Sequence, residues 1–397
     1  STAVPTPTST VVSTSTTARP ASDVFTIGVI TPRTGANTEL GTSIRTGVQL
    51  ALDDVNAAGG VNGHAVNVVQ RDEGDNPAAT ALAVQDLIQL GADAIIGPTS
   101  SVDVLGTLRT TVRAGILSCS PTATALALDA FPSDGLFFRT IPSDSLQAAA
   151  IARTVEQTGT DNAAVVYLDD AYGRPFATAV QNALAHQGTA VSLALGVDGS
   201  ENSLKTAVDT VAAQRPPVIV VVADAASGPG VVAAIDAAFS TSPPTFVVND
   251  QLRRPTSQAA AYPADLARRV IGVAPTALPP TWLLDRVHLL EPDSLGLFAA
   301  NAYDCVNAVA LAAEAASSTD PRSAAGELVA VTSNGTQCRD FSTCSSFLAN
   351  GRNIDYDGAT GLEIDARGRV TSAVFDQFTF NDTGRDVTTG SVSVTAG

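Results

Sequence analysis

Short apolar runs and helical stretches alternate along the chain from about residue 24. The first four apolar runs are residues 25–30, 66–70, 94–97 and 116–120. Between the first two runs, residues 42–57 carry apolar side chains at helical spacing. Continuous apolar strands separated by amphipathic helices are typical of a parallel sheet that helices cover on both faces.

The same pattern restarts after residue 141. A helical stretch at 145–157 is followed by apolar runs at 163–168, 190–195, 217–223 and 245–248. Two such series predict an α/β protein with two doubly wound, Rossmann-like lobes.

The pattern changes from about residue 274. We expect a long helix at 294–316, a shorter one at 324–331, and strands at 361–365 and 374–380. This part is too short for a third domain and is expected to complete the other two. The N-terminal lobe is therefore predicted to comprise residues 24–141 and 275–374, and the C-terminal lobe residues 142–274 and 375–397.

The first 23 residues have a different composition. Residues 1–20 contain 11 Ser/Thr and 3 Pro, with a single charge at Arg19. Such a segment cannot bury a core, so we expect a disordered stalk of the kind that tethers a protein to a cell surface. The alternative is a purification remnant or a ragged tail.

Charge and hydropathy restrict the classes of partner. With 22 Lys+Arg against 39 Asp+Glu in 397 residues, the formal net charge is −17. This acidity argues against nucleic acid and against an anionic membrane surface as partners. No apolar run reaches the roughly 18–20 residues that a membrane-spanning helix needs.

The motifs of common enzymes are weak or missing. Gly228, Gly230 and Ala233, with Asp250 further on, approach a dinucleotide fingerprint, but Pro229 fits better as the first residue of a helix. There is no phosphate-binding loop and no nucleophile elbow. The three histidines, His64, His186 and His288, are scattered. We therefore expect no catalytic residues, no metal and no organic cofactor.

Eight segments together resemble the type I periplasmic (solute) binding proteins of the branched-chain amino-acid, Leu/Ile/Val-binding group, which serve ABC importers. They are IGVITPRTG at 27–35, GVQLALDDVNAAGGVNG at 47–63, DEGDNPAAT at 72–80, AIIGPTSS at 94–101, SPTATA at 120–125, FFRTIPSDSLQ at 137–147, DDAYG at 169–173 and NAYDCV at 301–306. The resemblance implies two α/β lobes joined by three crossovers, with the ligand in the cleft between them.

This resemblance also implies a function. It is that of an extracytoplasmic substrate-binding protein, a monomer that captures a small carboxylate-bearing solute, such as an amino acid, and presents it to an ABC transporter permease. With the predicted stalk, we expect either a surface-tethered lipoprotein or a periplasmic protein. A ligand-sensing receptor or an amide-type regulator of the same fold is the alternative.

Polar residues follow two strands of the first lobe. Ser100 and Ser101 come after the run at 94–97, and Thr122 and Thr124 after the run at 116–120. Ligands of open α/β sheets lie beyond the carboxyl ends of strands, where free N–H groups of a following helix can hold a carboxylate. The resemblance assigns the ligand carboxylate to Ser101, Thr122 and Thr124; the alternative is that these hydroxyls only cap helices.

The resemblance places further contacts around the ligand. Tyr172 and Tyr303 match residues near the pocket, the alternative for each being a half-buried packing residue. Asp250 is expected to pair with the ligand ammonium, with Asp224 as a second candidate and turn capping as the alternative. Leu40 and Ala225 stand where the amino-acid binders often carry aromatic residues, which leaves a larger or differently shaped pocket.

The four cysteines suggest disulfides in an oxidising compartment. Cys338 and Cys344 lie in a polar, loop-like stretch, CRDFSTC, where a local bridge is expected and no CxxC or nearby His favours zinc. Cys119 and Cys305 map to the same region of the first lobe. We expect a second bridge between them; the alternative is two buried free thiols.

Overall fold

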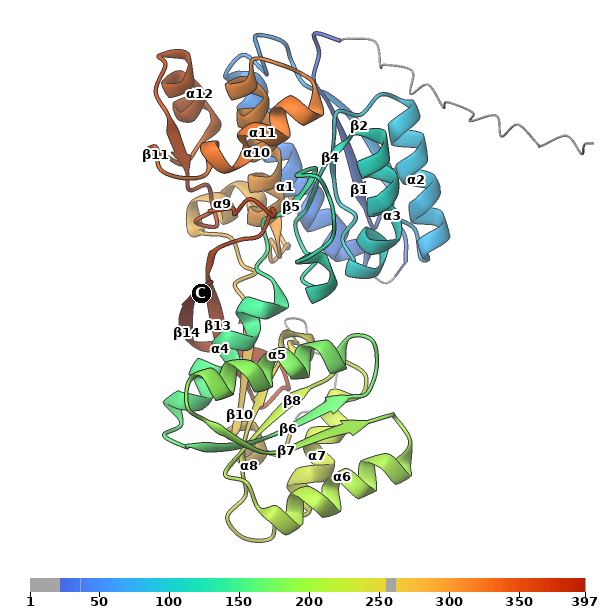
Figure 1. Cartoon of the computed structure of the whole chain (residues 1–397), viewed down its shortest axis with the longest axis vertical. Helices are drawn as coiled ribbons and strands as arrows, with labels where there is room; N and C mark the ends of the chain where they lie inside the picture. The colour runs from blue at the N-terminus through green and yellow to red at the C-terminus, as the bar shows by residue number, and fades with distance from the viewer. Residues whose placement is uncertain (1–21, 36, 255–261, 397) are drawn as a thin grey trace, which may run out of the picture.

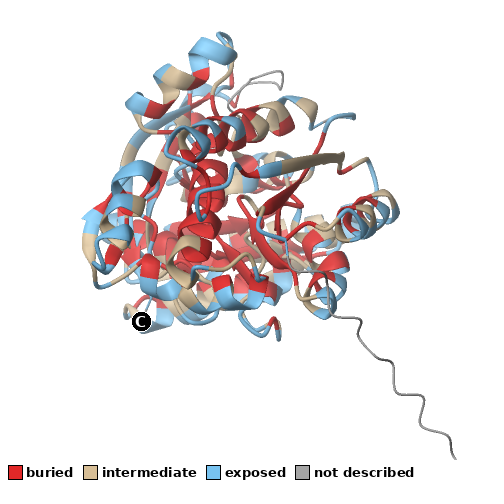
Figure 2. Cartoon of the chain, turned by 90° about the horizontal axis from the view of Figure 1, so that it is seen from above, coloured by how far each residue is buried: buried red, intermediate tan, exposed pale blue. Residues whose placement is uncertain are grey.

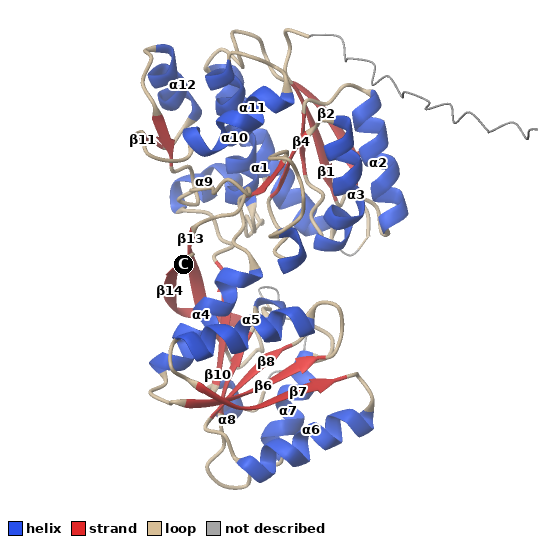
Figure 3. Cartoon of the chain, in the orientation of Figure 1, coloured by secondary structure: helices blue, strands red, loops and turns tan. Residues whose placement is uncertain are grey.

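The computed structural model describes residues 22–35, 37–254 and 262–396, which form two α/β lobes (Figure 1). All but the last two residues of the predicted stalk lie outside the described residues. Helices flank a sheet in each lobe (Figure 3), which confirms the predicted two-lobed fold. None of the described helices is long and apolar enough to cross a membrane.

The first lobe contains a five-stranded parallel sheet in the order β2-β1-β3-β4-β5. The strands are β1 (Thr26–Thr31), β2 (Asn67–Asp72), β3 (Ala94–Ile96), β4 (Leu117–Ser120) and β5 (Phe137–Arg139). Helices α1 (Thr38–Ala57), α2 (Pro77–Gln89) and α3 (Ser101–Ala114) follow the first three strands. Except for the edge strand β2, the strands are buried along their length, as their continuous apolar runs indicate.

The second lobe contains a seven-stranded sheet in the order β14-β13-β10-β9-β8-β6-β7. Its parallel strands are β6 (Asn162–Leu168), β7 (Ala190–Val197), β8 (Val218–Val222), β9 (Thr245–Val248) and β10 (Val270–Pro275). An antiparallel hairpin, β13 (Ser372–Phe380) and β14 (Asp386–Thr395), completes one edge. The helices are α4 (Asp144–Gln157), α5 (Gly173–His186), α6 (Glu201–Gln214), α7 (Gly228–Ala237) and α8 (Ala264–Ala267).

The segment between β10 and β13 packs on the first lobe. It comprises α9 (Thr281–Leu290), α10 (Ala299–Ala316), α11 (Pro321–Val331), β11 (Thr336–Cys338), α12 (Phe341–Ala349) and β12 (Ile354–Tyr356). The long helix expected at 294–316 begins later, at Ala299, because Gly296 and Phe298 adopt positive φ values that a helix does not allow. The strand expected at 361–365 was wrong: only an isolated bridge joins Ile364 to Val370 there.

Buried residues concentrate in the interior of the lobes (Figure 2), and in the first lobe they include most of α10 and strands of its sheet. Both expected disulfides are present in the structure, and no described cysteine is free. Cys119–Cys305 joins β4 to α10, and Cys338–Cys344 joins β11 to α12, with Cα–Cα distances of 5.8 and 5.5 Å.

The chain passes between the lobes three times. The first crossover (140–143) follows β5, the second (276–280) follows β10, and the third (365–371) precedes β13. The last predicted lobe boundary, at residue 374, falls inside β13. The three crossovers bring the carboxyl ends of the parallel strands of both sheets to the space between the lobes.

Candidate ligand-binding cleft

A cavity of about 590 Å³ lies between the lobes, within the range of small-molecule sites. It is lined by Leu40, Thr99, Ser100, Ser101, Val102, Thr122, Thr124, Ile141, Asp170, Tyr172, Asp224, Asp250, Gln251, Arg253, Ala274, Pro275, Ala277, Leu297 and Phe298. Seven of the eight predicted site residues are in this lining, and Tyr303 is not.

The loop after β3 is held by a buried carboxylate. Glu73 accepts hydrogen bonds from the Thr99 amide (3.0 Å), the Thr99 hydroxyl (2.7 Å) and the Ser100 amide (3.2 Å). Burial raises the pKa of Glu73, although these hydrogen bonds act in the opposite direction. Because the amides of Thr99 and Ser100 already donate to Glu73, an anion in the cavity would need hydrogen-bond donors that follow Ser100 in the chain.

Ser100 and Ser101 have different roles at the start of α3. The Ser100 hydroxyl accepts a hydrogen bond from the Asp103 amide at 3.0 Å and so caps the helix, as the alternative interpretation expected. Ser101 is the first helical residue, and its hydroxyl accepts from the Ala125 amide at 3.2 Å. Ser101 therefore connects the first loop to the second.

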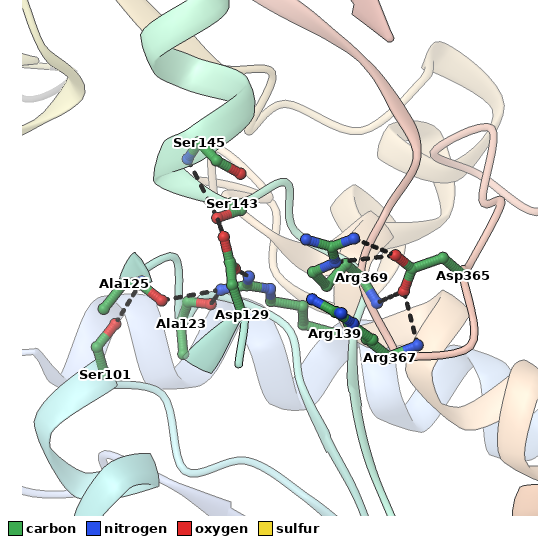
Figure 4. A network of polar contacts seen from close by, with 10 residues as sticks. All are labelled: Ser101, Ala123, Ala125, Asp129, Arg139, Ser143, Ser145, Asp365, Arg367 and Arg369. Atoms are coloured by element: carbon green, nitrogen blue, oxygen red, sulfur yellow. Dashed lines mark hydrogen bonds and ion pairs between the residues drawn. The ribbon is translucent and has the colours of Figure 1, made fainter. Parts of the chain in front are cut away.

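The loop after β4 is held by a buried cation (Figure 4). Arg139, 1% exposed, donates to the carbonyl oxygens of Ala123 (3.2 Å) and Ala125 (3.3 Å) and forms an ion pair with Asp129. Thr124, between the two carbonyls, has a backbone amide without a hydrogen-bond partner in the described part of the chain. The Thr122 hydroxyl is tied internally, since it donates to the Thr99 carbonyl at 2.7 Å.

The second lobe presents a carboxylate that is held in place. Asp250 follows β9, and its Oδ1 accepts from Gln147 Nε2 at 2.9 Å. The neighbouring Asn249 is fully buried, accepts from the Ala223 amide at 3.0 Å and donates to the Tyr172 hydroxyl at 3.1 Å. Hydrogen bonds to Asn249 and Gln147 therefore hold Tyr172 and Asp250 in place at the cavity.

Two further aspartates line the cavity but also cap turns. Asp224 Oδ1 accepts from the Ser227 amide at 2.7 Å, and Asp170 Oδ1 accepts from the Tyr172 amide at 2.9 Å. Asp224, the second candidate for the ammonium, thus has one carboxylate oxygen committed to its own turn. Sequence reasoning missed Asp170, although it belongs to the quoted DDAYG motif.

Two buried carboxylates on the acidic side of the site affect each other's protonation. Burial raises the pKa of Asp250. Burial and, second, the charge of Asp250 raise the pKa of Asp144 to about 7. Asp144 is 2% exposed, and no described residue is a hydrogen-bond partner of its Oδ1. A cation bound here would relieve the repulsion between the two carboxylates.

Positive charge in the lining is already neutralised. Of the described residues that line the cavity, Arg253 alone has a positively charged side chain. It forms ion pairs with Asp376 (2.9 Å) and Asp386 (3.0 Å). The first-lobe side therefore offers uncharged donors, and the second-lobe side offers carboxylates. Among the described residues, no group of His, Cys, Asp or Glu is arranged to hold a metal ion.

The structure places Tyr303 elsewhere. It is fully buried on α10, its hydroxyl donates to Asp54 Oδ2 at 2.6 Å, and its ring packs edge-on against Trp282. The expectation that it lies near the ligand is corrected, because the phase of α10 turns Tyr303 towards α1 and α9.

An apolar wall completes the cavity. It is formed by Leu40, Val102, Leu297 and Phe298. Phe298 has a φ of 59°, a left-handed conformation that bulky residues rarely adopt. The sequence carried no signal for the contributions of Leu297 and Phe298, whereas Leu40 was noted. Ala225 does not line the cavity.

Two α/β lobes with a cavity at the carboxyl ends of their strands define a two-lobed solute-binding protein. Residues 24–358 match the family model described as periplasmic binding protein, and the chain belongs to this family. The family consists of binding proteins, not enzymes.

Relatives agree with this assignment. The chain is 27% identical over 364 residues to the chemotactic signal transduction system substrate-binding protein BasB of Halobacterium salinarum, covering 85% of this chain and 82% of that protein. It is 25% identical over 329 residues to the leucine-, isoleucine-, valine-, threonine- and alanine-binding protein of Pseudomonas aeruginosa, covering 79% and 84%. The fold is similar to that of an ABC transporter substrate-binding protein of Desulfitobacterium hafniense in complex with Leu, with a TM-score of 0.71, 20% identity, and 92% and 99% coverage.

Proposed function

We propose that this protein is the extracytoplasmic substrate-binding component of an ABC importer and captures an α-amino acid between its lobes. The observation that carries the proposal is the placement of uncharged donors on one side of the cavity and Asp250 on the other. The Pseudomonas aeruginosa relative, an amino-acid binder by name, supports it.

The first lobe would bind the ligand carboxylate. The Thr124 amide lacks a partner among the described residues, and the N-terminus of α3 at Ser101 opens onto the same cavity. Partial positive charge at a helix N-terminus favours an anion there. The Ser101 hydroxyl adds a donor to the same side of the cavity, whereas the Thr124 hydroxyl already has the Asp144 carboxylate as its hydrogen-bond partner.

The second lobe would bind the ammonium. Asp250 lines the cavity, and its charge acts on Asp144, whose amide donates to the Thr124 carbonyl at 2.9 Å. The two charged groups of an α-amino acid are attached to one carbon, so a single ligand could contact both sides of the cavity. Closure would desolvate the pair, which strengthens charge-assisted hydrogen bonds.

The apolar wall supports a ligand with an apolar side chain. Leu40, Val102 and Phe298 carry no hydrogen-bonding side-chain group, and Val102 is 66% exposed. Covering this surface would add roughly 25 cal/mol for each Å² removed from water.

The mechanism would be hinge closure. A ligand that contacts both lobes stabilises the closed form by the difference between its affinities for the two forms. A permease would then distinguish the closed, loaded protein from the open one. One copy contains the whole cavity, so a monomer suffices.

A thermal-shift panel of the amino acids, followed by calorimetry, tests this proposal. A hundredfold excess of ligand over its Kd should add about 2.7 kcal/mol to the unfolding free energy. For the best ligand, Asp250→Asn should weaken binding by about 2–5 kcal/mol, because the ammonium loses its charged partner. The analogue without the amine, 4-methylpentanoate if the ligand is leucine, should bind both proteins alike.

Asp224→Asn is the matched control, since Asp224 lines the same cavity but caps its own turn. It should leave the affinity for the amino acid nearly unchanged. Equal affinity of wild type and Asp250→Asn for the amino acid would refute the ammonium assignment and favour simple carboxylates or amides as ligands.

A role in sensing is the second candidate, favoured by the similarity to the chemotactic protein BasB. Affinity purification of the ligand-loaded protein from its own membranes separates the two. Recovery of a permease with its ATPase supports import, and recovery of a chemotaxis transducer supports sensing.

A further inference from the structure

A second cavity lies at the hinge. We call it the rear pocket; its volume is about 410 Å³. Residues of all three crossovers contribute to it, among them Thr140, Leu278 and Val370. No ligand contact or function described above involves it.

The rear pocket and the ligand cavity share a wall. In the first crossover, Ile141 lines the ligand cavity, whereas Thr140 and Pro142 line the rear pocket. This alternation is that of an extended chain, in which successive side chains point to opposite faces.

The second crossover repeats the alternation. Pro275 and Ala277 line the ligand cavity, whereas Thr276 and Leu278 line the rear pocket. Residues 140–142 and 275–278, which we call the hinge wall, thus present one face to the ligand cavity and the other to the rear pocket.

The rear pocket is suited to an uncharged molecule. None of its described lining residues is charged, and two of the apolar ones, Leu278 and Val374, are 43% and 48% exposed. Asn301 also lines the pocket and is 3% exposed. Its Nδ2 donates to the Thr140 carbonyl at 2.8 Å, while its Oδ1 has no partner among the described residues. An apolar body with one hydrogen-bond donor matches this lining.

The shared wall couples the two cavities. The lobes can rotate only about the crossovers, so a rotation that narrows the ligand cavity on one face of the hinge wall widens the rear pocket on the other. A molecule that fills the widened rear pocket binds the closed form more tightly and shifts the population towards it. The coupling is reciprocal, because each ligand changes the other's affinity by the same factor.

We propose that the rear pocket is a second binding site, for a small uncharged molecule with an apolar body and one hydroxyl or amide donor, and that its occupation favours closure of the ligand cleft. The site goes beyond the proposed transport function, since it requires only the two-lobed fold and its hinge.

A filled-pocket variant tests the coupling without any ligand. Val374→Phe enlarges a side chain that lines the rear pocket and should reduce the radius of gyration measured by X-ray scattering. Val387→Phe is the control, because Val387 is similarly exposed (44%) on the adjacent strand β14 and does not line the pocket. Identical scattering of the two variants would overturn the coupling.

Benzyl alcohol is the probe for binding. Added at millimolar concentration, it should shift the NMR signals of Asn301, Ala373 and Thr140 in wild type, and these shifts should disappear in Val374→Phe. Shifts that persist in the variant, or that arise only elsewhere, contradict the site.

The last measurement tests the coupling between the rear pocket and the ligand cavity. Benzyl alcohol should raise the affinity for the amino acid identified in the panel by about fivefold or more. An unchanged affinity rejects the coupling. If no amino acid binds wild type, the transport proposal fails. The scattering and NMR measurements still test whether the rear pocket is a second binding site.

Discussion

Individual side chains at the cleft could be predicted where they follow parallel strands. Ser101, Thr124 and Asp250 come directly after apolar runs, and the carboxyl ends of parallel strands meet at one edge of each sheet. Tyr303 could not be placed in the same way. Residues 299–313 of α10 are all buried, so no polar face reveals the orientation of any one side chain.

The pair Asp144 and Asp250 leads to a pH-dependent stability. The pKa of Asp144 is raised from 3.8 to about 7, so the folded state binds its proton more tightly than the unfolded state. The resulting stabilisation is complete below pH 3.8 and is lost as the pH rises through about 7. At 1.36 kcal/mol per pKa unit, the loss is at most about 4 kcal/mol.

Urea unfolding of the ligand-free protein at pH 4 and pH 7.5 measures this effect. Asp304, whose pKa burial raises to about 6, gives the wild type a further slope in the same direction. The informative quantity is therefore the difference between wild type and Asp144→Asn. The unfolding free energy of the variant should change less with pH than that of the wild type. Parallel profiles would show that Asp144 is not the titrating group.

At the scale of elements, apolar runs that alternate with helical stretches were predictable, whereas strands β10 and β14 were not. The strand at 245–248 was placed to the residue, and α1 ends where it was expected. Strand β10 is a short apolar run, which periodicity cannot distinguish from a helix segment. Strand β14 is an exposed edge strand rich in Ser and Thr, so its burial pattern is weak.

Buried charges hold the loops after β3 and β4 in shape, and Glu73→Gln tests this for the loop after β3. A glutamine oxygen can still accept from the amides of Thr99 and Ser100, which share Oε1, but the NH₂ group that replaces Oε2 cannot accept from the Thr99 hydroxyl. Leaving this buried donor unsatisfied costs about 1–3 kcal/mol. We expect a fall in unfolding free energy of this size, together with weaker binding of the amino acid.

Glu201→Gln is the corresponding control, because Glu201 is exposed on α6 of the other lobe. Thermal unfolding and calorimetry of both variants give the comparison. A Glu73→Gln protein with wild-type affinity would mean that the loop keeps its shape without the buried carboxylate.

At the scale of the whole molecule, the Cys119–Cys305 bridge closes a loop that contains the parallel strands of the second lobe. The two cysteines are 186 residues apart in sequence. A loop this long should stabilise the folded state by about 4–5 kcal/mol through the unfolded chain. The double variant Cys119→Ala/Cys305→Ala should therefore destabilise the first lobe most.

The single tryptophan makes this lobe-specific effect measurable. Trp282 lies on α9, against the first lobe, so its fluorescence reports unfolding of that lobe alone, while circular dichroism reports both lobes. Removing Cys338–Cys344, which are 6 residues apart, should have a smaller effect. An equal shift for both pairs would contradict the loop-length argument. Titration of the denatured, unreduced wild type should detect no free thiols.

The internal hold on the two first-lobe loops has a kinetic consequence. If the ligand binds as proposed, the loops that Glu73 and Arg139 keep in shape would form the carboxylate site before any ligand arrives, and capture would begin on the first lobe alone. Asp250 would contact the ligand only as the second lobe closes. Changes in the first lobe would then alter the association rate, whereas changes at Asp250 would alter the residence time and leave the frequency of productive encounters almost untouched.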